Sequence, residues 1–143
     1  LGEEPFPDCL GALQLAVDEK TRYTKGMPEP SCTPRGRMTY KLKSRPREAD
    51  TDYDYRIVWV DRESFADYRS EFYKGGRLFK RVDKDWRSMD LDDPRGLFWA
   101  YWYAISPGDG NQGMAFIDPR AVSWNDDLHE DFWSESNLRR IKR

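Results

Sequence analysis

The sequence predicts a mainly β protein, an antiparallel meander with few short helices. Three observations predict this class. Aromatic residues make up 15% of the 143 residues, including six Trp, which argues against disorder of the whole chain. Several short stretches alternate apolar and polar residues, as strands do. Glycine-rich or acidic turns separate these stretches. The length suits one domain with a real core, and we expect residues 1–143 to form a single domain.

The first clear strand is predicted over residues 37–45, RMTYKLKSR. Its apolar residues alternate with polar ones, which is typical of a strand with one solvated face. The expected inner residues are Met38, Tyr40 and Leu42, and the expected outer residues are Thr39, Lys41 and Lys43. Residues 1–36 are punctuated by Gly and Pro. Their one ordered-looking piece is LGALQLAVDEKTRY (10–23), whose periodicity does not decide between a strand and a short helix.

The middle of the chain reads as three strands joined by two turns. YRIVWV (55–60) is the first strand, and DRES (61–64) is a turn whose side-chain oxygens can bond the local backbone. FADYRSEFY (65–73) is the second strand. KGG (74–76) supplies the positive φ of a tight hairpin, and RLFKRVDKDW (77–86) is the third strand.

The most apolar stretch is LFWAYWYAI (97–105), which carries no charge. It is far shorter than the ~20 residues of a membrane span, so we predict a strand covered on both faces. After a loop over 106–113, residues 114–118 and 121–126 are expected to form two short strands, or one strand interrupted by Pro119. The charged end, residues 127–143, is expected to hold a short helical turn and a docked tail.

Residues 108–113, GDGNQG, match the pattern G-x-G-x-x-G. A dinucleotide-binding loop opens a helix, whereas Pro119 and no helical pattern follow here. The loop also lacks the ligand set of a calcium loop. His129, the only histidine, lies among carboxylates without a nucleophile motif. We therefore expect a surface hairpin loop, no metal or cofactor, and no catalytic activity.

The two cysteines, Cys9 and Cys32, lie in Pro-rich, turn-like sequence. Loop cysteines of this kind suit a disulfide and an oxidising compartment, so we predict a Cys9–Cys32 disulfide. Small buried thiols are the alternative. A metal site is disfavoured because two Cys and one distant His fall short of a tetrahedral set.

The formal net charge is -2, with basic and acidic residues interspersed. Without a basic field, nucleic acid is not an expected partner. The sequence shows no signal peptide and no initiator Met. We expect a processed or truncated product, the C-terminal portion of a longer chain.

Aromatic residues gather on adjacent predicted strands, and this excess bears on function. They could form an ordinary core, or they could hold an apolar ligand such as an acyl chain on a curved sheet. Composition does not separate the two readings. As the walls of such a site we single out Trp59, Phe72, Phe79, Trp99 and Tyr101.

From about Tyr53 onward the order of features resembles the periplasmic outer-membrane lipoprotein-sorting proteins, the LolA/LolB-like superfamily. In that family a strand ending in Trp-Val-Asp leads through a turn into a strand bearing Glu and Tyr. A Gly turn, a Leu-x-Lys strand and a final Phe…Leu-Arg segment follow. The matching residues are Trp59, Val60, Asp61, Glu71, Tyr73, Gly76, Leu78, Lys80, Phe132, Leu138 and Arg139. The aromatic stretch and loop over 97–113 depart from the family pattern.

The resemblance implies a strongly curved antiparallel sheet with helices filling its concave side, here an incomplete half-barrel. It implies non-covalent carriage of lipid or a lipidated protein through the periplasm, without cofactor or catalytic residue. A second polypeptide completing the barrel and transient membrane-protein partners would fit this role. The alternative is a structural or protein-interaction module whose aromatic sheet docks a partner chain. A carrier should have a concave apolar cavity, and a module should have a flat patch buried by protein.

Overall fold

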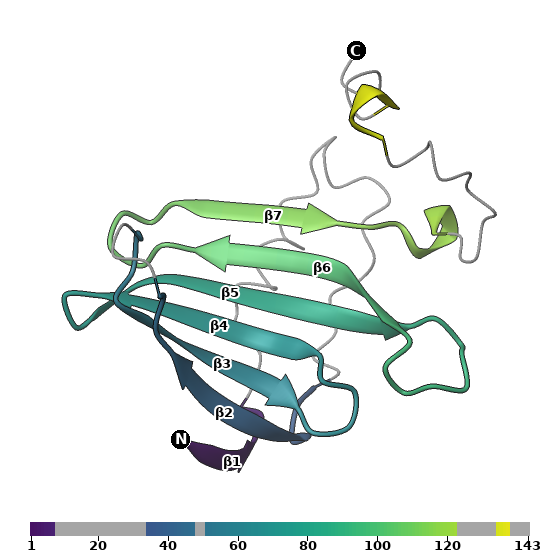
Figure 1. Ribbon diagram of the computed structural model, residues 1–143, viewed down its shortest axis with the longest axis horizontal. Coiled ribbons are helices and arrows are strands. Elements are labelled where there is room, and N and C mark those ends of the chain that lie inside the picture. The colour runs from purple at the N-terminus through teal and green to yellow at the C-terminus, as the bar shows by residue number, and fades with distance from the viewer. Residues whose placement is uncertain (8–33, 48–50, 123–133, 138–143) are drawn as a thin grey trace.

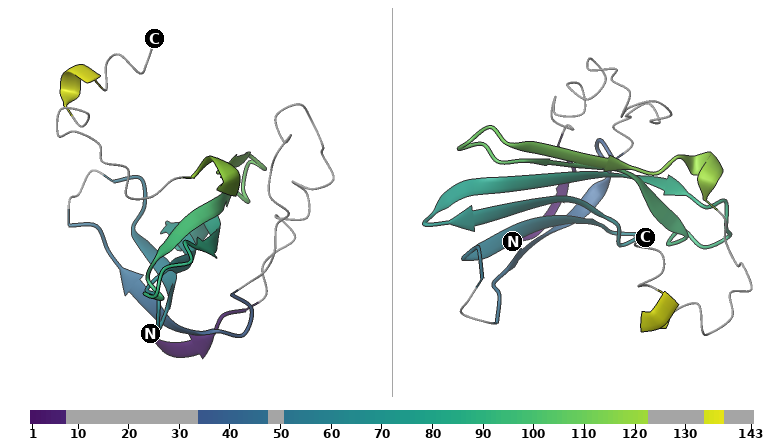
Figure 2. Two further views of the ribbon diagram at one scale, coloured as in Figure 1. Left: turned by 90° about the vertical axis from the view of Figure 1, so that its right-hand side faces the viewer. Right: turned by 90° about the horizontal axis from the view of Figure 1, so that it is seen from above.

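The computed structural model describes residues 1–7, 34–47, 51–122 and 134–137. These residues form one antiparallel sheet of seven strands in which each strand pairs with its neighbours in sequence. The sheet is twisted and curved and does not close into a barrel (Figures 1 and 2). The predicted fold class is therefore confirmed.

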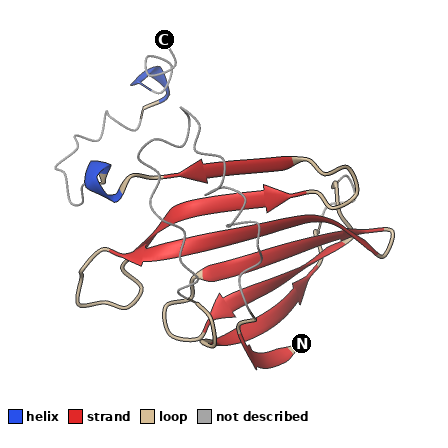
Figure 3. Cartoon of the chain, turned by 180° about the vertical axis from the view of Figure 1, so that it is seen from behind, coloured by secondary structure: helices blue, strands red, loops and turns tan. Residues whose placement is uncertain are grey.

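Five of the seven strands follow the predicted stretches closely, the first was not predicted, and the last begins two residues before its predicted stretch. A 3-10 turn over 119–121 replaces the start of the strand predicted over 121–126, and residues 123–126 lie outside the described residues. The strands are β1 (Gly2–Pro5), β2 (Met38–Ser44), β3 (Tyr55–Asp61), β4 (Asp67–Lys74), β5 (Arg77–Ser88), β6 (Leu97–Ile105) and β7 (Gln112–Phe116). Helical structure in the described residues is confined to a 3-10 turn, η2 (Pro119–Ala121), and a short turn at 135–137 (Figure 3). None of the described helices is long and apolar enough to cross a membrane.

Two of the predicted turns are explained by their backbone geometry. Gly75 and Gly76, between β4 and β5, have φ values of 56° and 73°, a region that residues with a Cβ rarely occupy. The GDGNQG segment closes the β6–β7 hairpin. There the Ser106 amide donates to the Asn111 carbonyl at 2.8 Å, and the Gly110 amide donates to the Ser106 carbonyl at 2.9 Å. The expected hairpin loop is confirmed, and Gly113 already belongs to β7.

Three register shifts interrupt the ladder. They fall between Trp59 and Val60, between Phe72 and Tyr73, and between Asp85 and Trp86. An extra residue on one strand bends that strand and increases the local twist. The shifts lie in consecutive strand pairs, so they contribute to the curvature of the sheet.

The expected faces of β2 are wrong. Met38 and Leu42 are exposed, the latter by 49%, whereas Thr39 is fully buried. Thr39 is small, and its hydroxyl donates to the Glu4 carbonyl of β1 at 2.8 Å. The side of β2 that carries Thr39 therefore faces the protein interior, and Met38, Tyr40 and Leu42 point outward. On the same face as Thr39, the Lys41 ammonium lies 4.9 Å from the centre of the Trp59 ring, a cation–π contact that also covers apolar surface.

Candidate ligand-binding face

Strand register divides the side chains of the sheet between two faces. Trp59 pairs with Arg69, Arg69 with Asp83, and Asp83 with Tyr103. Directly paired residues share a face, and so do residues two apart on a strand. We name this side the ionic face, which comprises Trp59, Arg69, Glu71, Arg81, Asp83, Tyr101 and Tyr103. The opposite face carries the paired row Leu42, Val58, Ser70, Val82 and Ala104.

The centre of the ionic face is a buried ion pair. Arg69 Nε lies 2.7 Å from Asp83 Oδ1, and Arg69 Nη2 lies 3.0 Å from Asp83 Oδ2. The side chains are only 5% and 7% exposed. The guanidinium also lies over the rings of Phe6 and Trp59, at 5.1 and 6.0 Å from their centres. The two parallel hydrogen bonds pair the opposite charges in a fixed geometry, which a buried ion pair requires.

A second ionic cluster lies beside the first on the same face, where Glu71 of β4 pairs with Arg81 of β5. Glu71 accepts bonds from Arg81 Nε at 3.0 Å and Nη2 at 2.7 Å, and from the Tyr73 hydroxyl at 2.7 Å. Burial, together with the bond to Glu71, raises the pKa of Tyr73 to about 12. The hydroxyl therefore stays protonated and remains a donor across the physiological range.

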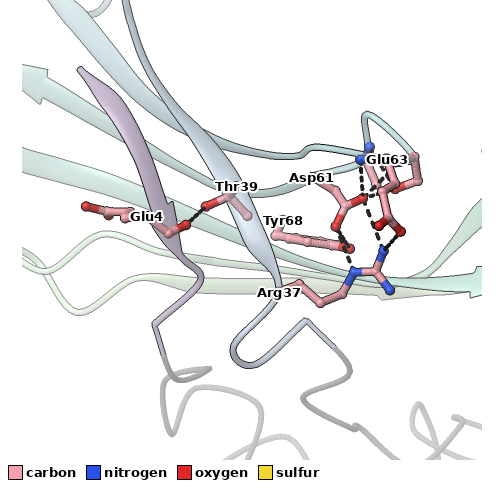
Figure 4. Close-up of polar contacts among 8 residues, drawn as sticks. Glu4, Arg37, Thr39, Asp61, Glu63 and Tyr68 are labelled. Carbon is pink, nitrogen blue, oxygen red and sulfur yellow. Dashed lines mark hydrogen bonds and ion pairs between the residues drawn. The ribbon is translucent and has the colours of Figure 1, made fainter.

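Asp61, at the end of β3, organises the turn into β4 (Figure 4). Its carboxylate accepts bonds from Arg37 Nε at 2.7 Å and from the Tyr68 hydroxyl at 2.9 Å. It also accepts from the amides of Glu63 at 3.0 Å and Ser64 at 2.8 Å. The predicted turn with side-chain oxygens bonded to backbone is confirmed, and Asp61 is its hub.

The ionisation of this cluster follows from its contacts. Burial alone would raise the pKa of Asp61, but the bonds from Arg37, the Ser64 amide and Tyr68 outweigh it and hold that pKa well below its usual range. Burial and the bond to Asp61 raise the pKa of Tyr68 to about 12. Asp61 is thus a fixed anion, and Tyr68 is a fixed neutral donor. Neither is poised for proton transfer near neutral pH.

A pocket of about 490 Å³ lies beside this turn. Its lining residues are Arg37, Met38, Tyr40, Asp61, Arg62 and Glu63. The charges in it are already paired: Arg37 contacts Asp61 and Glu63, and Arg62 contacts Glu3 at 3.0 Å. None of the five predicted wall residues lines this pocket.

The structure does not gather the five predicted wall residues into one surface. Trp59 and Tyr101 are buried on the ionic face. Phe72 lies on the opposite face, where it contacts Phe79 with ring centres 6.4 Å apart. Trp99 pairs with Trp86, which lies at the opposite end of β5 from Phe79. Phe72, Phe79 and Trp99 are half-buried and retain exposed surface.

The buried ion pairs were not predicted from the sequence. A signal for them was present, because opposite charges recur at every second position on consecutive strands. The pattern is Arg69 and Glu71 on one strand, and Arg81 and Asp83 on the next. Cys9, Cys32 and His129 lie outside the described residues.

A family model with the description "Uncharacterized protein" matches residues 19–140. The match spans most of the chain, so the chain belongs to that family. The comparison with curated proteins gave no match.

Two solved structures share the fold. One is described as an outer membrane lipoprotein-sorting protein domain from Vibrio parahaemolyticus, with a TM-score of 0.55 and 19% identity over 76% of this chain. The other is a DUF1329 family protein from Desulfovibrio piger ATCC 29098, with a TM-score of 0.54 and 17% identity over 72% of this chain. The chain spans 43% and 42% of their lengths. The predicted resemblance to the LolA/LolB-like superfamily is thereby confirmed at the level of the fold.

Proposed function

We propose that the protein is a non-catalytic carrier or binder of lipid or lipidated protein that uses its aromatic sheet. The observation that carries the proposal is the fold shared with a lipoprotein-sorting domain over 76% of the chain. A curved antiparallel sheet offers a continuous surface to an acyl chain. The ion pairs described above join charges to each other and are consistent with a structural role.

The proposed contacts are Trp59, Phe72, Phe79, Trp99 and Tyr101. Phe72, Phe79 and Trp99 are half-buried, so part of their surface can meet an apolar ligand directly. Trp59 and Tyr101 are buried, so they contact a ligand only once the groups covering them move. Aromatic side chains provide large contact area at small entropy cost, which suits a site for acyl chains.

The proposed location is the periplasm, with membrane proteins as transient partners and lipid or lipidated protein as cargo. The lipoprotein-sorting neighbour supports this location. The proposed Cys9–Cys32 disulfide would fit the same compartment, because such bonds persist where the environment is oxidising.

Native mass spectrometry of the protein purified from cells without detergent tests the proposal. We expect a population with an added mass of one lipid, released by organic solvent and identified after extraction. Protein without any lipid adduct, from cells where it is correctly exported and folded, would contradict the carrier function.

The second candidate is a protein-interaction module, and one observation favours it. Met38, Tyr40 and Leu42 form an outward apolar stripe along β2, and Leu42 is 49% exposed. Isolated exposed apolar residues are common, but a row along one strand is typical of a docking surface. The same mass spectra distinguish the two candidates, because a module would carry a polypeptide in place of a lipid.

A further inference from the structure

The two edges of the sheet differ in chemistry. β1 carries two glutamates and a proline, and its charges are engaged: Glu3 pairs with Arg62 at 3.0 Å and Glu4 with Lys41 at 3.1 Å. Charge and proline on an edge strand oppose pairing with further strands. β7, the other edge (Figure 1), reads QGMAF, without charge or proline, and its register with β6 is regular.

The backbone of β7 has an available outer side in the described part of the sheet, where β6 is its one neighbour. The Ile117 amide donates to the Ala100 carbonyl of β6 at 2.9 Å. Backbone groups alternate in direction along an antiparallel strand. Gly113 and Ala115 therefore point their backbone groups toward β6. Gln112, Met114 and Phe116 point theirs away from the sheet.

We propose that β7 pairs antiparallel with β7 of a second copy of this chain, about a twofold axis at Met114. The three outward residues are spaced symmetrically about Met114. The pairing therefore sets Met114 against Met114 of the partner subunit, and Gln112 against Phe116 of the partner subunit. In each of these pairs, the amide of either residue donates a hydrogen bond to the carbonyl of the other.

Self-pairing fits this strand better than pairing with a charged segment does. A twofold contact must be complementary to itself, and an uncharged strand brings no like charges together across the axis. Met114 is 37% exposed, and its sulfur lies 3.9 Å from the Tyr101 hydroxyl. Pairing would bury this exposed side chain. Five residues give much less than the ~1,600 Å² of a standard interface, so the dimer is weak and depends on concentration.

Sedimentation velocity over a concentration series tests the proposal. The parent chain should shift from monomer to dimer as its concentration rises. Met114→Lys should raise the dimer dissociation constant at least about tenfold, because two ammonium groups would meet at the axis. Leu91→Lys is the matched control in the β5–β6 connection, since Leu91 is also an exposed apolar residue, and it should leave the dimer unchanged.

Two further variants keep the outcome decisive. Met114→Pro removes the outward amide of β7 without removing a β6–β7 backbone hydrogen bond, and it should also abolish the dimer. Mixing Met114→Lys with Met114→Glu should restore a dimer that neither variant forms alone, as the twofold geometry demands. A parent chain that stays monomeric, a dimer insensitive to Met114→Lys, or a mixture that fails to associate would each overturn the proposal.

Discussion

Arg69 and Asp83 form a bidentate ion pair across β4 and β5, at 2.7 and 3.0 Å, with both side chains almost wholly buried. Such a pair stabilises the folded protein little more than apolar residues of similar volume would, because both charges lose their hydration. Breaking it is costly, since the remaining charge stays buried without its partner.

We therefore expect Asp83→Asn to lower the free energy of unfolding by about 3 kcal/mol, measured by urea denaturation. The double variant Arg69→Met, Asp83→Leu should recover most of that loss, since no unpaired charge remains. Asp93→Asn is the control, because it breaks the exposed Asp93–Arg95 pair and should leave the urea midpoint unchanged. Full stability of Asp83→Asn would contradict the assigned role of the pair.

Asp61 should make stability depend on acid pH. Its pKa is lower in the folded protein than in the unfolded chain, so the unfolded chain binds the proton first as pH falls. The contribution of Asp61 is fully present above about pH 4 and is lost progressively below it. Urea midpoints between about pH 5 and pH 2 should fall more steeply for the parent than for Asp61→Asn. Parallel slopes would exclude Asp61 as a source of the acid sensitivity.

Phe65 has a φ of 61° and is 62% exposed. A bulky residue with positive φ carries a strain of about 1 kcal/mol, and Asn tolerates this region better. Phe65→Asn should therefore raise the free energy of unfolding by about 0.5 kcal/mol. Phe65→Ala should bring no such gain, because alanine lacks the short polar side chain with which asparagine can bond the local backbone at positive φ. An equal gain from both variants would place the effect in the exposed ring instead.

The Cys9–Cys32 disulfide remains a prediction from the sequence. In the chain-entropy model, closing a loop of this length stabilises the fold by about 3 kcal/mol. Thiol titration of the protein, unfolded without reductant, should find no free thiol before reduction and two afterwards. Two reactive thiols in the unreduced sample would disprove the bond.

Local patterns predicted the strands because alternation and turn residues act within a few positions. The stretch 97–105 and the KGG turn illustrate this: both match the observed β6 and hairpin. The ion pairs were not predicted, because Arg69 meets Asp83 only in a particular register between β4 and β5. That register shifts between Phe72 and Tyr73, and the alternation of apolar and polar residues does not locate such a shift.

Assignment of faces failed for a related reason. On β2, alternation separates Met38 and Leu42 from Thr39, but it does not tell which set faces inward. The neighbouring strand decides, because the Thr39 hydroxyl reaches the Glu4 carbonyl of β1. For the same reason, the five predicted wall residues fall on two faces, since aromatic content alone does not reveal the register of the strands.

Binding of a fluorescent fatty acid, followed by quenching of Trp emission, tests the central claim that the sheet holds an apolar ligand. Phe72→Asp and Trp99→Asp should each weaken binding about tenfold or more, because a carboxylate opposes an acyl chain at the proposed wall. Phe65→Asp makes the same change in the exposed turn and should leave binding intact, with all three variants folded by circular dichroism. No binding to the parent chain, or equal binding by parent and wall variants, would contradict the account.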